Sequence, residues 1–232
     1  MNDDAMQRQL ERIRKAYDLT VEQYWQGINP VDSIPQNIKN SPFYESLIAD
    51  SRALSSGADD IRDYLSPEAG MRFLDAGCSA NLVNYRLAQW PSLYYGVDIS
   101  SALIGAMNDF IAQESISIGG LYVADVADLP FDDNFFDIAT VIGVLEYGTL
   151  EYIEKALAEI NRVCKPEARV VFDIPNKDHS HAKDMAKLEK HLGRPNYHYA
   201  RSSFNKLLAP LFTTERMDDS RVMMKYYVCV RK

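Results

Sequence analysis

The chain has 232 residues, of which 47% are hydrophobic and 25% are charged, and its formal net charge is −8. These values are ordinary for a globular protein and differ from the low hydrophobicity and high charge of disordered chains. The negative charge disfavours nucleic acids and anionic lipid surfaces as partners, because both are bound through a broad positive field. The length suits one α/β domain with a helical extension.

The start of the chain, MNDDAMQRQLERIRKAY, is charged and holds no apolar segment typical of a signal peptide. No later stretch approaches the roughly 18 apolar residues of a membrane span, so a cytoplasmic protein without a membrane partner is expected. Cys78, Cys164 and Cys229 are widely separated and form no CxxC pair. The cysteines therefore indicate neither a disulfide framework nor a zinc site.

Residues 1–66 are predicted to form an N-terminal helical extension or cap. Apolar residues recur at helical spacing from Met6 to Tyr17, which predicts an opening amphipathic helix. The proline-rich stretch 27–42 is expected to be a loop. A second helix is expected over about 46–65, where Pro67 would end it.

Residues 67–232 are predicted to form a Rossmann-like core, because short apolar runs alternate with segments of helical period. The expected parallel strands are 71–75, 93–97, 121–125, 136–142 and 169–174. Between the last two strands, an apolar face from Ile153 to Cys164 predicts a helix with Thr149 as its N-cap.

The last part of the chain, after residue 200, is predicted to hold a short helix at 202–209 and a closing β-hairpin. The hairpin strands are expected at 211–217 and 224–230, separated by the polar turn 218–220. The predicted fold is thus α/β, with a doubly wound, mostly parallel seven-stranded sheet, an antiparallel C-terminal hairpin and an N-terminal helical extension.

The turn after the first expected strand reads Asp75-Ala76-Gly77-Cys78-Ser79, and a helix is expected over 81–89. Strand, tight turn and helix in this order place backbone N–H groups and a helix N-terminus beside a ligand at the sheet edge. An ordinary β–α turn that needs one glycine for its backbone is the competing interpretation.

Two further acids end the next two expected strands. Asp98 stands 21 positions after Gly77, where a carboxylate can accept both ribose hydroxyls of an adenosine, although it could also cap the following helix. Asp125 ends the third strand. Since ligands of open α/β sheets bind at the carboxyl ends of the strands, Asp75, Asp98 and Asp125 are expected to converge on one crevice.

The stretch from about Met71 to Pro175 resembles the class I S-adenosylmethionine-dependent methyltransferases, especially small-molecule enzymes in which one region reads D-x-x-x-L-P-F-x-D-x-x-F-D. Here that region runs from Asp125 to Asp137, and Val144-Leu145-Glu146-Tyr147 corresponds to the family's V-L-E-H segment. The resemblance implies S-adenosylmethionine as the cofactor and methyl transfer to a small-molecule acceptor.

The resemblance also implies which residues hold each part of the cofactor. The residues expected to bind it are Asp75, Gly77, Cys78, Ser79, Asp98, Ile99, Asp125, Val126 and Ile142. In the family's pattern, the segment 75–79 holds the methionine portion. Asp98 would hold the ribose, Ile99 the adenine face, and Asp125 with Val126 the adenine edge.

The glycine loop departs from the family's Gly-x-Gly-x-Gly, because Ser79 and Asn81 stand where two glycines are usual. Serine and asparagine are small, and asparagine tolerates left-handed backbone, so cofactor binding is still expected. The change motivates an alternative function, a non-catalytic S-adenosylmethionine-binding or interaction protein. A nicotinamide dehydrogenase ranks last, since such enzymes depend more on the missing glycines and leave Asp125 unexplained.

Candidates for the acceptor side lie after strand four, in the extension and near the C-terminal hairpin. Tyr147, in place of the family's histidine, is predicted to position the acceptor, with packing as the competing role. His179 and His181 are candidates for catalysis, although a His-x-His pair in a polar loop is more often solvated surface. No acid or cysteine at ligand spacing accompanies them, so no metal is predicted.

Further substrate-binding candidates are His198 and, in the extension, Tyr24 and Trp25. Together with Tyr17, the aromatic rings of the extension could close over a sulfonium or form a packing surface. Residues 176–201 are predicted to cover the substrate and carry six Lys or Arg against three Asp or Glu. This local charge favours an anionic acceptor, and a solvated helix around 182–192 is the competing reading. The sequence identifies neither the acceptor atom nor the oligomeric state.

Overall fold

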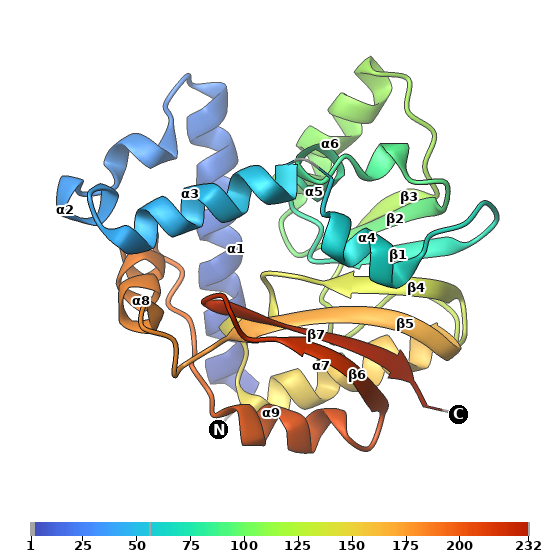
Figure 1. Ribbon diagram of the computed structural model, residues 1–232. Helices are drawn as coiled ribbons and strands as arrows, with labels where there is room; N and C mark the ends of the chain where they lie inside the picture. The colour runs from blue at the N-terminus through green and yellow to red at the C-terminus, as the bar shows by residue number, and fades with distance from the viewer. Residues whose placement is uncertain (1–2, 56, 232) are drawn as a thin grey trace.

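The computed structural model describes residues 3–55 and 57–231, and its elements are shown in Figure 1. In chain order they are α1 (Asp3–Trp25), η1 (Pro30–Ser33), α2 (Gln36–Lys39), α3 (Pro42–Ser55), α4 (Asp59–Leu65), β1 (Arg72–Ala76), α5 (Asn81–Asn84), η2 (Leu87–Gln89), β2 (Leu93–Asp98), α6 (Ser101–Gln113), β3 (Gly120–Val123), β4 (Phe136–Val141), η3 (Leu145–Tyr147), α7 (Leu150–Val163), β5 (Cys164–Pro175), α8 (Ala182–His191), α9 (Arg201–Leu208), β6 (Phe212–Asp218) and β7 (Met223–Val230).

The strands form one seven-stranded sheet in the order β3-β2-β1-β4-β5-β7-β6. Strands β1 to β5 pair in parallel, whereas β7 is antiparallel to both β5 and β6. The predicted fold class is therefore confirmed, including the C-terminal hairpin. Because the parallel strands run the same way, their carboxyl ends meet at one edge of the sheet, where a ligand site is expected.

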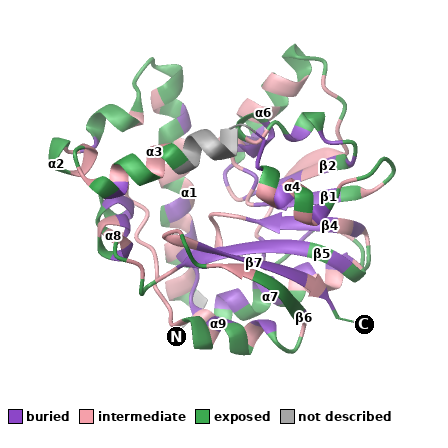
Figure 2. Ribbon diagram, in the orientation of Figure 1, coloured by how far each residue is buried: buried purple, intermediate pink, exposed green. Residues whose placement is uncertain are grey.

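The central strands of the sheet, β1, β4 and β5, are largely buried on both faces, which explains why they read as continuous apolar runs. In β1, Phe73 packs with α4, α5 and η2 on one face, and Leu74 packs with α7 and α9 on the other. Figure 2 shows the central strands almost entirely buried. Helix α7 begins as predicted, because the Thr149 side chain accepts a hydrogen bond from the Tyr152 backbone N at 3.3 Å.

Two predicted helices are each interrupted. The helix expected over 46–65 is instead α3 and α4, separated where Gly57 (φ +128°) and Ala58 (φ +51°) take left-handed backbone. The helix expected over 81–89 is a single turn, α5, followed by the 3-10 helix η2, and the break falls at Arg86 (φ +53°). Gly57 is a sequence signal for the first break, whereas non-glycine residues such as Arg86 enter the left-handed region rarely, so the second break has no clear sequence signal.

The N-terminal helices pack on the core and on the segment before the hairpin. Leu10 of α1 belongs to the main core, while Phe43 of α3 clusters with Met185 and Leu188 of α8. Helix α1 crosses the region beyond the strand ends, as Figure 1 shows. The division of the chain at residue 66 stays a prediction. Within 3–55 and 57–231, no helix is long and apolar enough to cross a membrane.

Candidate active site

A cavity of about 320 Å³ lies between the carboxyl ends of the parallel strands and α1. The volume falls at the lower end of the range for small-molecule sites, roughly 300–1,000 Å³. Of the residues expected to bind the cofactor, those that line it are Gly77, Ser79, Asp98, Ile99, Asp125, Val126 and Ile142. The structure therefore brings most of the predicted set together at one place.

Asp98 lines this cavity at the end of β2 and is 7% exposed. Its Oδ2 accepts a hydrogen bond from the Ser79 backbone N, and its Oδ1 accepts one from the Ser100 N, each at 2.8 Å. An ionised carboxylate has about four lone-pair sites, so capacity for two hydroxyl donors remains. The competing cap role is excluded, because Ser100 itself caps α6 by accepting from the Leu103 N at 3.1 Å.

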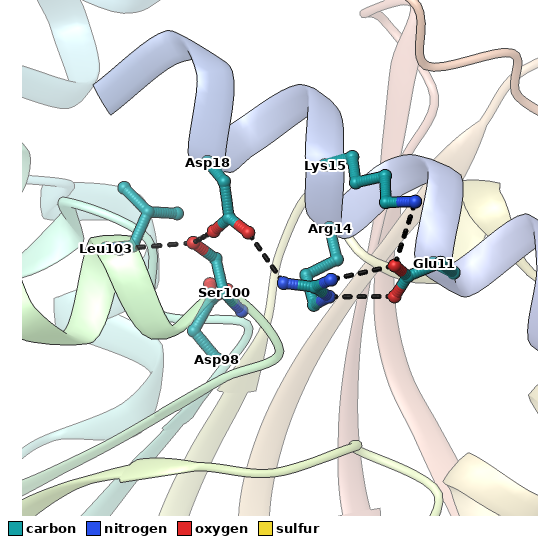
Figure 3. Close-up of polar contacts among 7 residues, drawn as sticks. All are labelled: Glu11, Arg14, Lys15, Asp18, Asp98, Ser100 and Leu103. Atoms are coloured by element: carbon teal, nitrogen blue, oxygen red, sulfur yellow. Dashed lines mark hydrogen bonds and ion pairs between the residues drawn. The ribbon is translucent and has the colours of Figure 1, made fainter. Parts of the chain in front are cut away.

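Helix α1 is tied to the strand end that carries Asp98 (Figure 3). The Ser100 hydroxyl donates to Asp18 Oδ1 at 2.5 Å, and the other Asp18 oxygen accepts from Arg14 at 2.8 Å. On the same helix, Leu10, Ile13 and Tyr17 line the cavity. Helix α1 thus forms one wall of the cavity and is held there by polar contacts.

Asp125 is fixed at the other side of the cavity, just beyond β3. Its Oδ1 accepts hydrogen bonds from the Tyr152 hydroxyl at 2.6 Å and from the Ala127 backbone N at 2.9 Å. Ile99 and Val126 supply apolar surface in the same cavity. An acid held in place beside apolar walls suits a flat heterocycle with a polar edge.

Two of the predicted cofactor residues, Asp75 and Cys78, do not line this cavity. Asp75 is 1% exposed and accepts hydrogen bonds from Tyr94 Oη at 2.9 Å, Thr140 Oγ1 at 2.8 Å and Asn81 Nδ2 at 3.4 Å. Burial raises the pKa of Asp75 to about 6. Asp75 is thus held by three side-chain hydrogen bonds, one of them from Asn81, the first residue of α5.

The glycine loop is held by backbone hydrogen bonds to strand β2. The Gly77 and Cys78 N–H groups both donate to the Val97 carbonyl, at 2.7 and 2.8 Å, so they already have a partner. Gly77 has φ +81°, and a Cβ there would lie 2.0 Å from Val144 Cγ2. Glycine is therefore required at this position by backbone conformation and by packing against Val144.

A second cavity, of about 390 Å³, adjoins the first. The residues that line both cavities are Tyr17, Tyr85, Ile142, Gly143, Tyr147 and Arg194. Tyr147, 6% exposed, donates a hydrogen bond to Glu189 Oε2 at 3.0 Å, and its hydroxyl oxygen lies 3.2 Å from that of Tyr17. Burial raises the pKa of Tyr147 well above its ordinary value, which suits positioning better than proton removal.

Sequence reasoning missed several residues of the shared wall. Arg194 donates to Glu189 Oε1 at 3.1 Å, and its guanidinium lies 4.8 Å from the centre of the Tyr17 ring. Tyr85 follows α5 and lines both cavities. Only the expectation that residues 176–201 cover the substrate pointed toward Arg194 and Glu189, and no motif marked either residue.

The remaining acceptor-side candidates line neither cavity. Tyr24 and Trp25 are 76% and 63% exposed, so the structure does not place them over a ligand. His179 accepts from the His181 backbone N at 3.2 Å, and the His181 ring packs 5.9 Å from Phe43. His198 pairs with Asn196 at 3.1 Å. The described residues contain no group of three or more metal-ligating side chains arranged to hold an ion.

The sequence of the chain is similar to those of known methyltransferases. A family model described as "Methyltransferase domain" matches residues 74–172. A sterol 4-C-methyltransferase of Caenorhabditis elegans is 27% identical over 76% of this chain and 56% of its own length. A 2-phytyl-1,4-naphtoquinone methyltransferase of Nostoc punctiforme is 34% identical over 45% of this chain and 46% of its own.

Solved structures share the fold. Magnesium protoporphyrin IX methyltransferase from Synechocystis PCC 6803, with bound S-adenosylhomocysteine, superposes with a TM-score of 0.65 at 18% identity, covering 97% of this chain and 100% of that one. A [4+2]-cyclase superposes with a TM-score of 0.62 at 17% identity, covering 78% of this chain and 80% of that one.

The resemblance seen in the sequence is confirmed at the level of domain and fold: residues 74–172 match a methyltransferase domain, and the chain shares the fold of a methyltransferase solved with S-adenosylhomocysteine. The chain spans about half the length of the curated relatives it matches. At these identities, the solved structures establish the fold and leave the reaction of the whole protein to be argued from its site.

Proposed function

We propose that the chain transfers a methyl group from S-adenosylmethionine to a small-molecule acceptor. The observation that carries the proposal is the pair of adjoining cavities that share a wall containing Tyr147. The first cavity holds Asp98 and Asp125 at two strand ends, and the second is enclosed by α3, α8 and the end of β5. A donor site and an acceptor site side by side are what a direct displacement needs.

The residues of the first cavity fit the cofactor. Asp98 has lone pairs left for the ribose hydroxyls, and Ile99 and Val126 offer apolar faces for adenine. Of the three aromatic residues of the extension expected near the sulfonium, Tyr17 lines the wall shared with the second cavity, where its ring can attract a cation, while Tyr24 and Trp25 are exposed. When bound, S-adenosylmethionine supplies a methyl group activated by its sulfonium.

The chain's own contribution to the reaction is alignment and exclusion of water. Helix α1 covers the first cavity, the proposed donor cavity, and the hydrogen bond between Asp18 and Ser100 holds the helix in place. Tyr147, locked by Glu189, presents a fixed phenol at the boundary between the two cavities. Positioning of this kind supplies much of the rate enhancement when the reactive group belongs to the cofactor.

The charge of the acceptor and the location of the protein stay predictions. Of the six basic residues in 176–201 that favour an anionic acceptor, only Arg194 lines the two cavities, and it is paired with Glu189. Lys183, Lys187 and Lys190 are exposed on α8. A cytoplasmic location rests on the sequence alone.

Calorimetry with S-adenosylmethionine and S-adenosylhomocysteine tests the first half of the proposal, and turnover tests the second. We expect both ligands to bind, and a panel of small metabolites to reveal an acceptor that drives formation of S-adenosylhomocysteine. Absence of cofactor binding would reject the proposal. Binding without turnover on any acceptor would favour the alternative of a non-catalytic S-adenosylmethionine-binding or interaction protein.

A further inference from the structure

The second cavity has two buried carboxylates that the proposed reaction does not use. Glu146 lies in η3, directly after β4, and Asp173 lies near the end of β5; they are 5% and 3% exposed and both line the cavity. Asp173 Oδ1 accepts a hydrogen bond from the Gly143 N at 2.8 Å. Glu146 Oε2 is buried and accepts no hydrogen bond from any described residue.

An unsatisfied buried carboxylate oxygen is costly, and a second acid nearby increases the cost. Burial, followed by the charge of Asp173, raises the pKa of Glu146 well above its ordinary value. Burial also raises the pKa of Asp173 to about 6. Native proteins tolerate such groups mainly at functional sites, where a ligand supplies the missing donor.

The basic residues that line this cavity form their hydrogen bonds with acids other than Glu146. Lys225, opposite Asp173 in the β5–β7 ladder, donates to Asp60 Oδ2 at 2.6 Å, although its charge also lowers the pKa of Asp173. Arg194 is paired with Glu189, although its charge also lowers the pKa of Glu146 against the larger effect of burial. The charge of Arg221 acts on Asp60 and Asp218. The positive charges therefore do not supply a hydrogen-bond donor to Glu146 Oε2.

The rest of the cavity provides apolar surface. Leu47 of α3, Met185 of α8, and Val222 and Met223 before and at the start of β7 line it. A ligand that fits this space has an apolar body and one polar end that donates hydrogen bonds. Methionine side chains adapt to ligands of varied shape, so the apolar wall sets no narrow limit on the body.

Building on the proposed function, we infer that the acceptor carries a basic nitrogen, an amine or amidine, which binds at Glu146 and Asp173 while its apolar part lies against Leu47, Met185 and Met223. A protonated nitrogen offers several N–H donors and a positive charge to the two acids. The inference opposes the anionic acceptor favoured by the charge of residues 176–201, so the sign of the ligand's charge decides between them.

Calorimetry on the full chain with matched probes tests the inference. The probes are phenethylamine and octylamine, each compared with a carboxylate of matched size, 3-phenylpropanoate and nonanoate, with and without S-adenosylhomocysteine. We expect each amine to bind about tenfold or more tightly than its carboxylate partner. Equal or tighter binding of the carboxylates, or no binding of either amine up to its solubility limit, overturns the inference.

Variants then assign the effect to the two acids. Glu146→Gln and Asp173→Asn keep shape and remove charge, and each should weaken amine binding about tenfold. Asp178→Asn, at an exposed acid outside the cavity, is the matched control and should bind amines as the wild type does. Unchanged amine affinity in both folded variants overturns the inference; if one variant fails to fold, the other decides.

The proposed function and this inference fail in different measurements. If the wild type does not bind S-adenosylmethionine, the proposed function is rejected, and the comparison of amines with carboxylates can still be made. A failed amine test, with S-adenosylmethionine still bound, strikes only the inference.

Discussion

The two adjoining cavities are built from the chain in different ways. Most residues that line the donor cavity lie between Gly77 and Tyr152. Helix α1 supplies most of the lining residues from outside this stretch. The acceptor cavity collects residues from α3, α8 and the start of β7, which are far apart in sequence. The proposed cofactor site is thus built from local motifs, whereas the proposed acceptor site depends on how distant segments pack.

Asp75 and Asp98 lie near the ends of neighbouring strands, but only Asp98 lines the first cavity. Asp75→Ala should lower the free energy of unfolding by about 3 kcal/mol, because Tyr94 and Thr140 lose a buried acceptor. Urea denaturation measures this, with Asp109→Ala, at an exposed acid of α6, as the control. A stable Asp75→Ala protein that no longer binds S-adenosylmethionine would show that Asp75 binds the cofactor.

The acceptor cavity should reveal its buried acids through the pH dependence of stability. Because the pKa of Asp173 is raised to about 6, the folded chain keeps a proton that the unfolded chain releases between about pH 4 and 6. Rising pH therefore lowers stability across this window, on the order of 2 kcal/mol for this group.

Asp173→Asn should flatten part of that decline, measured by denaturation at several pH values. The decline should not vanish, because burial raises the pKa of Asp75 to about 6 as well. An unchanged pH profile in Asp173→Asn would show that Asp173 is ionised at no cost, and Asp178→Asn controls for the loss of a surface charge.

Asp98 tests the donor cavity directly. Asp98→Ala should weaken S-adenosylmethionine binding by about 2 kcal/mol, since the ribose hydroxyls lose a charged acceptor. Calorimetry measures the change, and Asp109→Ala should leave it at zero. Full affinity in Asp98→Ala would remove the ribose role and with it the strongest residue of the cofactor site.

The fold and the donor cavity could be predicted because their signals are local. Alternating apolar runs gave all seven strands, Thr149 marked the start of α7, and acids at strand ends gave Asp98 and Asp125. The left-handed conformation of Ala58 and Arg86, at the breaks in two expected helices, could not be predicted, because non-glycine residues enter that region rarely.

The acceptor cavity could be predicted only in outline, since its residues meet through packing of distant elements. Tyr17 and Tyr24 stand seven residues apart on α1, about two turns or roughly 10 Å along the helix. Helical period places both on one face and does not reveal which turn lies over the cavity. Only Tyr17 does, while Tyr24 is exposed.

Tyr147 links the two cavities and should affect turnover more than stability. Tyr147→Phe keeps the ring and removes the hydroxyl that bonds Glu189, so kcat/KM should fall about tenfold with S-adenosylmethionine affinity unchanged. The thermal midpoint should fall slightly, because Glu189 keeps its Arg194 contact. Tyr199→Phe, which removes a hydroxyl bonded to the Gly148 carbonyl outside both cavities, is the control. Equal losses of turnover in both variants would make Tyr147 a packing residue.

The smallest effects should come from Ser79 and Asn81, the two positions that lack the family's glycines. Glycine should be tolerated or favourable at the first position and destabilising at the second. Ser79 has φ +39°, so Ser79→Gly relieves strain and should keep or slightly improve S-adenosylmethionine affinity, by less than about 1 kcal/mol. Asn81 is the first residue of α5, and its side chain donates to Asp75. Asn81→Gly removes that donor and should lower stability by about 1 kcal/mol. Calorimetry and urea denaturation of both variants measure the contrast, and a loss of cofactor affinity in Ser79→Gly would reveal a ligand contact by the Ser79 side chain.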